Sequence, residues 1–208
     1  ATVRMCKEKG VAIGAHPGYP DLMGFGRRAM AVNPAEAKAY MIYQVGALQA
    51  FCDSYGVTLQ HMKLHGAFYN TACVTPALAD AVLDGLQAVN PNIAAMVLSG
   101  SYIAKEAERR GIPVIQEVFA DRGYTDEGTL VPRTEPGAFI KDSQEALERV
   151  LMMVTEGKVV TNTGNTIDIV ADSVCVHGDN PEAIAFTNYI REGLTKAGVT
   201  VANFQNRK

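Results

Sequence analysis

Three of the chain's four histidines occupy the same kind of position, and this position restricts the fold. His16, His65 and His177 each end a short apolar run, and each is followed at once by Gly or Pro. Short apolar runs separated by helical stretches are typical of parallel strands, whose carboxyl ends open at the mouth of an α/β sheet or barrel. We therefore expect the three imidazoles to come together in one site.

Strand and helix patterns alternate along most of the chain. A helix end is expected at 2–9, closed by Gly10, and its position predicts that the fold starts upstream of residue 1. Strands are expected at 11–15, 59–65, 94–99, 113–119, 173–177 and 199–202, and a hairpin at 158–170. Helices are expected at 34–55, 75–89, 102–110, 142–154 and 179–194, and an irregular segment at 120–141.

These repeated strand–helix units indicate a parallel α/β fold formed by one domain over residues 1–208. A TIM-like barrel is favoured over an open doubly wound sheet, because polar residues recur at one strand end after another. The chain also lacks a glycine-rich nucleotide turn that would mark the switch point of an open sheet.

Composition narrows the class of protein. The net charge is −3 and the pI is about 5.8. Neither a basic stripe nor a Lys/Arg run is present, which argues against a protein that binds nucleic acid or an anionic membrane. No apolar stretch approaches the roughly 20 residues that span a bilayer. The cysteines have no CxxC spacing and are typical of reduced thiols in a cytoplasmic protein.

The first polar segment is the exit loop GAHPGYPDLMGFGRR, residues 14–28. Glycine and proline fix its backbone, and we expect His16, Tyr19 and Asp21 to face the site. A tight turn with solvated charges is the alternative. The GFGRRA string resembles a GxGxxA dinucleotide motif only superficially, because it neither follows a strand directly nor opens a helix.

The second segment is HMKLHGAFYN, residues 61–70. Lys63 and His65 are two residues apart and are expected to share one face of their strand. A lysine in a barrel interior needs a counter-charge or a bound anion, and Glu117 is the expected partner. His61 is expected to be structural, whereas Tyr69 and Asn70 are expected in the loop beyond the strand.

Two further segments carry charge. Residues 116–133 contain Asp121, Arg122 and Arg133, and long aperiodic loops of this kind are usually lids or binding loops. VCVHGDNPEA, residues 174–183, offers His177 and Asp179, although Asp179 could equally be a helix N-cap.

Neutral histidines with carboxylates can ligate a divalent metal or act as general acids and bases. The chain has no HExxH pair, no GxSxG motif and no phosphate-binding GxxxxGK[ST] loop. Any metal ligands would therefore come one from each strand, and any use of ATP would need an atypical site or a partner.

In these segments the chain resembles the lactam-utilisation (LamB/YcsF) family. The motifs GAHPGYPDxxGFGRR, KxHGAxYN, EVFADRxY…GTLVPR and CVHGDNPEA occur in order from one end of the chain to the other. The resemblance implies a seven-stranded β/α barrel akin to polysaccharide deacetylases. It also implies the A subunit of an ATP-dependent 5-oxoprolinase, which uses ATP with Mg and acts with subunits B and C to open 5-oxoproline to glutamate. The family's opening segment, with an acidic first strand and a GFHAGD-type loop, is expected to precede residue 1.

Activation of a lactam oxygen by phosphorylation would need cations for phosphate and acid–base groups for water attack. The expected catalytic residues are His16, Lys63, His65, Glu117 and His177. The expected substrate-binding residues are Tyr19, Asp21, Asn70, Asp121, Arg122, Arg133 and Asp179. Two alternatives stay open: a metal-dependent amide or carbohydrate hydrolase that uses His16 and His65 as ligands, and a non-catalytic subunit that binds a small acidic ligand.

Overall fold

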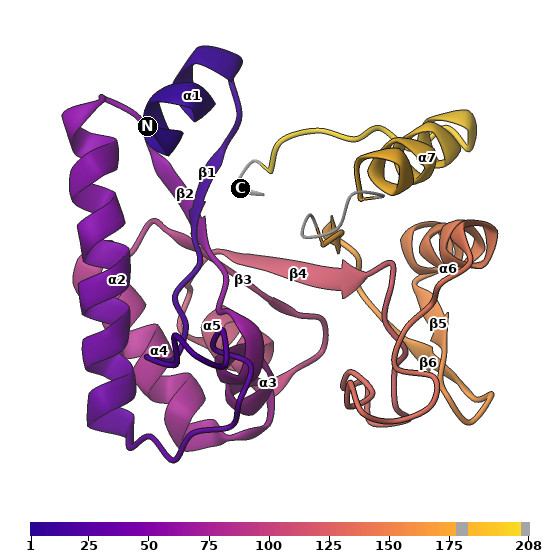
Figure 1. The fold of residues 1–208 in the computed structure, drawn as a ribbon, viewed down its shortest axis with the longest axis horizontal. Helices are drawn as coiled ribbons and strands as arrows, with labels where there is room; N and C mark the ends of the chain where they lie inside the picture. The colour runs from indigo at the N-terminus through magenta and orange to yellow at the C-terminus, as the bar shows by residue number, and fades with distance from the viewer. Residues whose placement is uncertain (178–182, 205–208) are drawn as a thin grey trace. The chain divides into compact units, whose positions relative to one another are not determined.

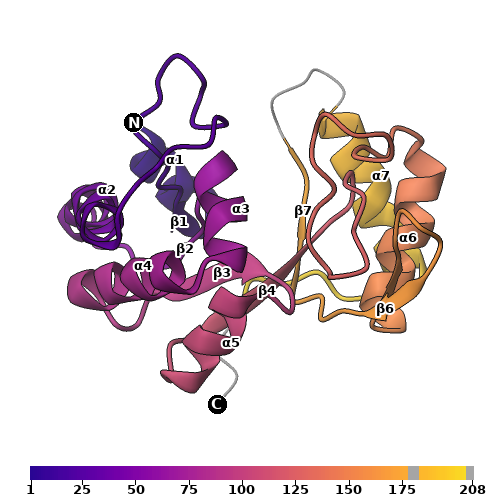
Figure 2. The same ribbon diagram turned by 90° about the horizontal axis from the view of Figure 1, so that it is seen from below.

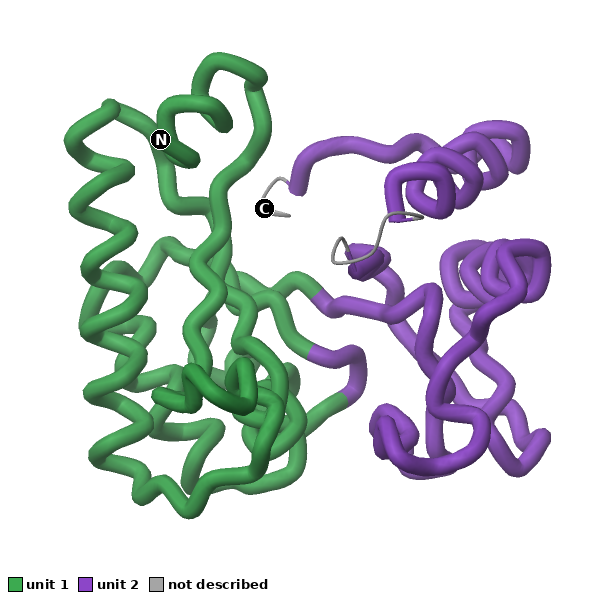
Figure 3. Tube along the Cα trace, viewed as in Figure 1, with its two compact units in different colours: residues 1–97, 101–115 green, residues 98–100, 116–208 purple. Residues whose placement is uncertain are grey.

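The computed structural model describes residues 1–177 and 183–204. The chain divides into two compact units (Figure 3). Unit 1 comprises residues 1–97 and 101–115, and unit 2 comprises residues 98–100 and 116–208. The prediction of one domain over the whole chain stays a prediction, and each unit is described by itself.

A five-stranded sheet contains the strands that the sequence predicts most strongly (Figure 1). Its order is β1-β2-β3-β4-β7, and β1–β2, β2–β3 and β4–β7 pair in parallel. The bounds are β1 Ile13–Ala15, β2 Leu59–Met62, β3 Ala94–Leu98, β4 Val114–Phe119 and β7 Ser173–Cys175. The α/β class is confirmed.

Unit 1 contains five helices among its described residues. They are α1 Thr2–Lys9, α2 Pro34–Ser54, α3 Gly66–Val74, α4 Pro76–Val89 and α5 Tyr102–Arg109. Asn33 and Glu36 form a capping box at the start of α2, as the sequence Asn33-Pro34-Ala35-Glu36 predicts. α2 packs against α4 (Figure 2). The buried side of α2 presents Met41 and Val45, which are both fully inaccessible to solvent.

Apolar residues that recur every three or four positions predict one buried face on α2: Ala37, Met41, Val45, Leu48, Phe51 and Tyr55. This prediction is wrong in the last turns. Phe51 is 62% exposed and Tyr55 is 38% exposed, whereas Cys52 is completely buried. The predicted apolar face followed the larger aromatic side chains. The smaller thiol occupies the core instead, because the 3.6-residue period places position 52, seven residues after Val45, on the buried face.

The segment after β2 also differs from the prediction. β2 ends at Met62 rather than at His65, and α3 begins at Gly66, so that Tyr69 and Asn70 are helical and not in a loop. Gly66 adopts φ +57°, which turns the chain directly from the strand into the helix. The buried residues of α3, Phe68, Tyr69, Ala72 and Cys73, recur at helical spacing over only nine residues. So short a pattern is easily missed beside the longer helix that follows.

The described residues of unit 2 contain the predicted hairpin and two helices. β5 Lys158–Val160 pairs antiparallel with β6 Thr166–Asp168, and the helices are α6 Ser143–Thr155 and α7 Ala183–Lys196. α6 packs against α7. β7 ends at Cys175, two residues before the predicted end of the strand.

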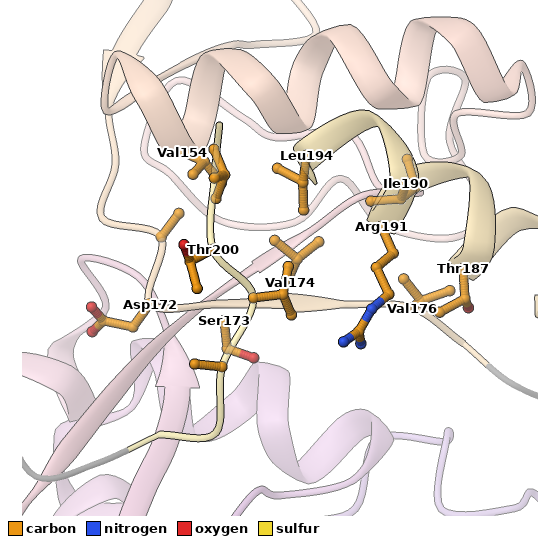
Figure 4. A pocket seen from close by; sticks show the side chains of 14 residues that line it. Val154, Asp172, Ser173, Val174, Val176, Thr187, Ile190, Arg191, Leu194 and Thr200 are labelled. Carbon is orange, nitrogen blue, oxygen red and sulfur yellow. The ribbon is translucent and has the colours of Figure 1, made fainter. Parts of the chain in front are cut away.

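The closing strand predicted at 199–202 is absent from the described residues. The backbone N–H of Val199 donates to the carbonyl of Leu194 at 3.0 Å, which is a contact of the helix end rather than of a strand ladder. Thr200 and Leu194 line a cavity of about 310 Å³ together with Val174 of β7 (Figure 4). Residues 199–202 border this cavity, but Thr200, Val201 and Ala202 are exposed.

Residues 120–141 form no regular helix or strand, as predicted. Isolated bridges join Arg122 to Phe139 and Tyr124 to Leu130. The hydroxyl of the fully buried Tyr124 accepts the backbone N–H of Phe119 at 2.9 Å, and burial raises the pKa of this phenol. The long loop is thus fastened to the end of β4.

Among the described residues, no single helix is long and apolar enough to cross a membrane. Helices α3 and α4 together meet that length and composition, but they bend by 115° at the break between them.

Candidate functional site

The loops that leave β1 and β2 run side by side in unit 1 and bring two predicted residues together. The backbone N–H of Lys63 donates to Ala15 O at 2.9 Å, and that of His65 donates to Pro17 O at 2.8 Å. These bonds extend the parallel pairing of β1 and β2 beyond the strands. The rings of His16 and His65 meet edge to face, with centroids 4.9 Å apart.

Every ring nitrogen of the two histidines lies within hydrogen-bond distance of a partner. Nδ1 of His65 lies 3.0 Å from Nε2 of His16. Nδ1 of His16 donates to the carbonyl of Lys63 at 2.7 Å, and Nε2 of His65 donates to the carbonyl of Phe25 at 2.7 Å. Two neutral rings carry only two protons, so the bond between the rings forms when the pair holds one further proton and a positive charge.

This bonding pattern bears on the metal alternative. No ring lone pair of His16 or His65 is left facing open space, which does not suit the reading in which both rings ligate a metal. The described residues also contain no group of three possible metal ligands.

Two glycines permit the loops to approach each other this closely. Gly26 and Gly66 both have positive φ, at +66° and +57°. A Cβ at Gly26 would lie 2.9 Å from Cδ2 of His65, and one at Gly66 would lie 2.5 Å from the carbonyl oxygen of Gly26. The GFG and HGA motifs are therefore a steric requirement of the histidine pair.

His61 is where the sequence places it, on β2 ahead of the site. It is half-buried, and Nδ1 lies 3.0 Å from the side-chain oxygen of Gln60. A Cβ at Gly14 would fall 2.1 Å from Nε2 of His61. Burial lowers the pKa of His61, and the positive charge of Lys63 lowers it further. These surroundings are those of a structural, neutral histidine.

Asp21 clamps the first loop rather than facing solvent. The two carboxylate oxygens lie 3.1 and 3.0 Å from Nε of Arg28, and Oδ1 accepts the backbone N–H of Gly24 at 2.9 Å. The hydrogen bonds from Arg28 lower the pKa of Asp21 from 3.8 to about 2, against the opposing effect of desolvation. The alternative of a turn with solvated charges is wrong for Asp21, which is only 6% exposed.

The clamped loop borders a cavity of about 290 Å³ in unit 1. Its walls include both histidines, Tyr19, Phe25 and Gln44. Gln44, which sequence reasoning missed, bonds both the N–H and the carbonyl of Gly18, at 3.0 and 2.9 Å. Tyr19 stacks on Phe68 with ring centroids 4.6 Å apart, and burial raises the pKa of its hydroxyl.

The tip of the same loop is apolar and exposed. Leu22 is 97% exposed and Met23 is 95% exposed. Phe25 follows with a left-handed φ of +54°, which is uncommon for a residue with a side chain. This backbone belongs to the residue whose carbonyl accepts the N–H of His65.

Lys63 and Asn70 are in unit 1, but they are placed differently. Lys63 is half-buried, and its Nζ lies 5.9 Å from the ring centroid of Tyr69. Asn70 is exposed on α3. Glu117, which is 1% exposed on β4, belongs to unit 2, and its pairing with Lys63 stays a prediction.

A second pair of predicted residues comes together in unit 2. Nδ1 of His177 lies 2.8 Å from Oδ2 of Asp121. Both side chains are mostly buried, and both border a cavity of about 710 Å³. The convergence of His177 with the histidines of unit 1 stays a prediction, and Asp179 lies outside the described residues.

The two arginines expected to hold phosphate differ in placement. Arg122 is 3% exposed and donates to the carbonyls of Val131 and Ala138 at 2.5 and 2.8 Å. Burial lowers the pKa of Arg122, and the charge of Arg133 lowers it further. Arg133 is exposed and lies 5.2 Å from the ring centroid of Phe139. Arg122 therefore fastens the loop by binding its carbonyls, a role that the sequence did not indicate.

Together these features define an α/β protein with a parallel sheet and histidine-bearing loops at the carboxyl ends of its strands. The chain belongs to the LamB/YcsF family, whose sequence profile matches residues 1–208.

The relatives are similar over nearly the whole chain. The A subunit of 5-oxoprolinase from Fusobacterium nucleatum is 58% identical over 96% of this chain and 78% of the relative. That of Pyrococcus horikoshii is 50% identical over the same shares. The crystal structure of a lactam utilization protein from Thermus thermophilus superposes with a TM-score of 0.88 at 44% identity, covering 97% of this chain and 81% of that one.

Proposed function

We propose that this chain is the A subunit of an ATP-dependent 5-oxoprolinase, which hydrolyses the lactam bond of 5-oxoproline to give glutamate. The observation that carries the proposal is the long match to proteins that bear the name of this 5-oxoprolinase component. The His16–His65 pair lies within two of the motifs that led to the family. We further propose that the fold is a seven-stranded barrel related to the polysaccharide deacetylases.

The enzyme requires partners in this proposal. The relatives are named as one lettered component of a larger enzyme, which supports an assembly of several chains, and we propose subunits B and C as the partners. A cytoplasmic location agrees with the use of ATP and with four cysteines that form no disulfide.

We assign ATP to the assembled enzyme rather than to a pocket of this chain. A nucleotide triphosphate needs cations that are free to meet its phosphates. Arg122 does not fit this task, because its guanidinium is buried and donates to two carbonyls of its own loop. Calorimetry with ATP and Mg on this chain alone is expected to give no heat of binding, and saturable binding would contradict the assignment.

The function is tested by measuring release of glutamate and phosphate from 5-oxoproline. The complete protein is expected to turn over substrate with ATP and both partners, and to be inactive when ATP or either partner is left out. Turnover that needs no ATP and is lost to a chelator would instead identify a metal-dependent hydrolase. Binding of 5-oxoproline without any turnover in the full assembly would identify a ligand-binding role.

A first variant to test in this assay is His65→Ala. We expect turnover to fall by about 10²–10⁴-fold, which is the usual contribution of a general acid–base group. Thr155→Ala, which removes an exposed hydroxyl from the end of α6, is the control and should keep full activity. Normal turnover of His65→Ala would remove His65 from the catalytic set.

A further inference from the structure

We propose that Asp121 is a positioning residue that makes His177 a general base, so that the cavity of unit 2 holds the scissile amide bond. This inference rests on the proposed function. The substrate class is a small lactam, and the base acts on the water that attacks its carbonyl carbon.

The hydrogen bond between the two side chains fixes the tautomer of His177. A carboxylate can only accept, so Nδ1 of His177 carries the proton that lies between it and Oδ2 of Asp121, 2.8 Å away. Nε2 of the neutral ring then holds a lone pair. A histidine oriented in this way by a carboxylate is the arrangement that accepts a proton in many hydrolytic sites.

The surroundings of Asp121 strengthen the electrostatic interaction of its carboxylate with His177. The second oxygen of Asp121, Oδ1, is buried and has no hydrogen-bond partner among the described residues. Its carboxylate is 23% exposed. Because no second donor among the described residues binds Oδ1, the negative charge of Asp121 interacts mainly with the imidazole and can stabilise the positive charge that the ring gains during the reaction.

The cavity beside the pair can accept a small ring. It has a volume of about 710 Å³ and is lined by Ile140, Val176 and Phe186, with Lys141 and Tyr189 as polar groups. The ring of Phe119 is stacked against that of His177, with centroids 6.1 Å apart. Apolar walls around the hydrogen-bonded imidazole and carboxylate strengthen the electrostatic interaction between them, because they lower the local dielectric.

In the opening of the lactam, His177 moves one proton from water to the ring nitrogen. The oxygen of water forms a bond to the lactam carbonyl carbon while one proton of that water moves to Nε2 of His177. His177 then returns this proton to the ring nitrogen as the carbon–nitrogen bond breaks. In the assembled enzyme, transfer of the terminal phosphoryl group of ATP to the lactam oxygen precedes this step and releases ADP. Breaking the carbon–nitrogen bond then leaves an acyl phosphate, which a second water hydrolyses to glutamate and phosphate.

The test combines kinetics with a spectroscopic measurement on the full chain. Asp121→Asn in the reconstituted enzyme is expected to lower kcat by about 10²–10⁴-fold with KM nearly unchanged. Asp121→Glu should recover part of the loss. In ¹⁵N spectra of histidine-labelled protein, the His177 ring should be protonated at Nδ1 in the parent and lose this preference in Asp121→Asn.

Asp126→Asn is the matched control, because Asp126 lies in the same loop and binds the hydroxyls of Thr161 and Thr163. It should leave kcat and the His177 spectrum unchanged. An Asp121→Asn protein that folds and retains kcat, or retains the tautomer, overturns the inference while 5-oxoproline turnover by the parent still supports the function. If the parent shows no turnover, the function fails, and the tautomer measurement alone decides the positioning role.

Discussion

At the scale of the residue, the loop after β1 is held by a charge pair rather than by regular structure. Asp21 binds Arg28 through both carboxylate oxygens and also accepts the N–H of Gly24. Because the pKa of Asp21 is lower in the folded protein than in the unfolded chain, ionisation of this carboxyl stabilises the fold. That contribution is complete above the unfolded value of 3.8 and disappears as the pH falls to about 2.

We expect Asp21→Asn to lower the melting temperature at neutral pH and to flatten its fall between pH 4 and about pH 2. Thermal unfolding followed by circular dichroism measures both effects. Arg28→Gln should produce a similar loss, and the double variant should be little worse than either single variant, because both changes break one interaction. Additive losses would show that the two side chains stabilise the loop independently.

The residue types alone did not determine which group each charged side chain binds. Asp21 binds a neighbouring arginine and Arg122 binds loop carbonyls, and the contact of either residue with substrate stays a prediction. Both partners lie within about twenty residues along the chain, where only the folded path of the loop decides which groups meet. Asp121 and His177 are 56 residues apart and still meet, because parallel strands bring their exit loops together.

At the scale of the element, the packing of α2 on α4 depends on a glycine. A Cβ at Gly85 of α4 would lie 2.6 Å from Cβ of Met41 and 3.0 Å from the carbonyl oxygen of Lys38. These two atoms are a Cβ and a backbone oxygen of α2, and neither can move as freely as the end of a flexible side chain. The two helices therefore approach closely at this point.

Gly85→Ala is expected to destabilise the protein by about 1–3 kcal/mol, because overpacking outweighs the helix propensity that alanine adds. Gly46→Ala is the matched control. Gly46 lies inside α2, and its Cβ would meet only Val89, at 4.0 Å. This change should stabilise the protein by about 0.5–1 kcal/mol. Unfolding in urea gives both values, and the same sign for the two variants would contradict the packing argument.

Long periodic helices and buried strands were predictable, and short elements were not. The capping box at Asn33 and the pattern of α4 marked two helices correctly. α3 was missed because a positive φ at Gly66 places it directly after a strand, where the sequence still looked extended. The strand predicted at 199–202 is absent because β propensity reflects packing on a sheet, whereas Thr200, Val201 and Ala202 are exposed.

At the scale of the whole molecule, a three-residue segment from the middle of unit 1's sequence belongs to unit 2. Ser99, which is 6% exposed, donates to the side chain of Gln116 at 3.1 Å and accepts the N–H of Val170 at 2.8 Å. The backbone N–H of Ser99 also donates to Glu117 at 3.1 Å. The chain therefore crosses between the units at 97–98, 100–101 and 115–116.

Ser99→Ala is expected to lower the free energy of unfolding by about 0.5–1.5 kcal/mol, because the N–H of Val170 loses its acceptor and the side chain of Gln116 loses one of its donors. Hydrogen exchange should show faster opening at the Val170 amide. Ser54→Ala, which removes an exposed hydroxyl, should change stability by no more than about 0.5 kcal/mol. An unchanged Val170 exchange rate would mean that Ser99 does not anchor this segment.

The exposed loop tip at Leu22 and Met23 is also the part of the chain most open to oxidation. Peroxide reaches a thioether that is 95% exposed well before it reaches that of Met41, which is completely buried. Stored protein should therefore gain its first sulfoxide at Met23. The mass of the peptide that contains this residue then measures oxidative damage next to the histidine pair.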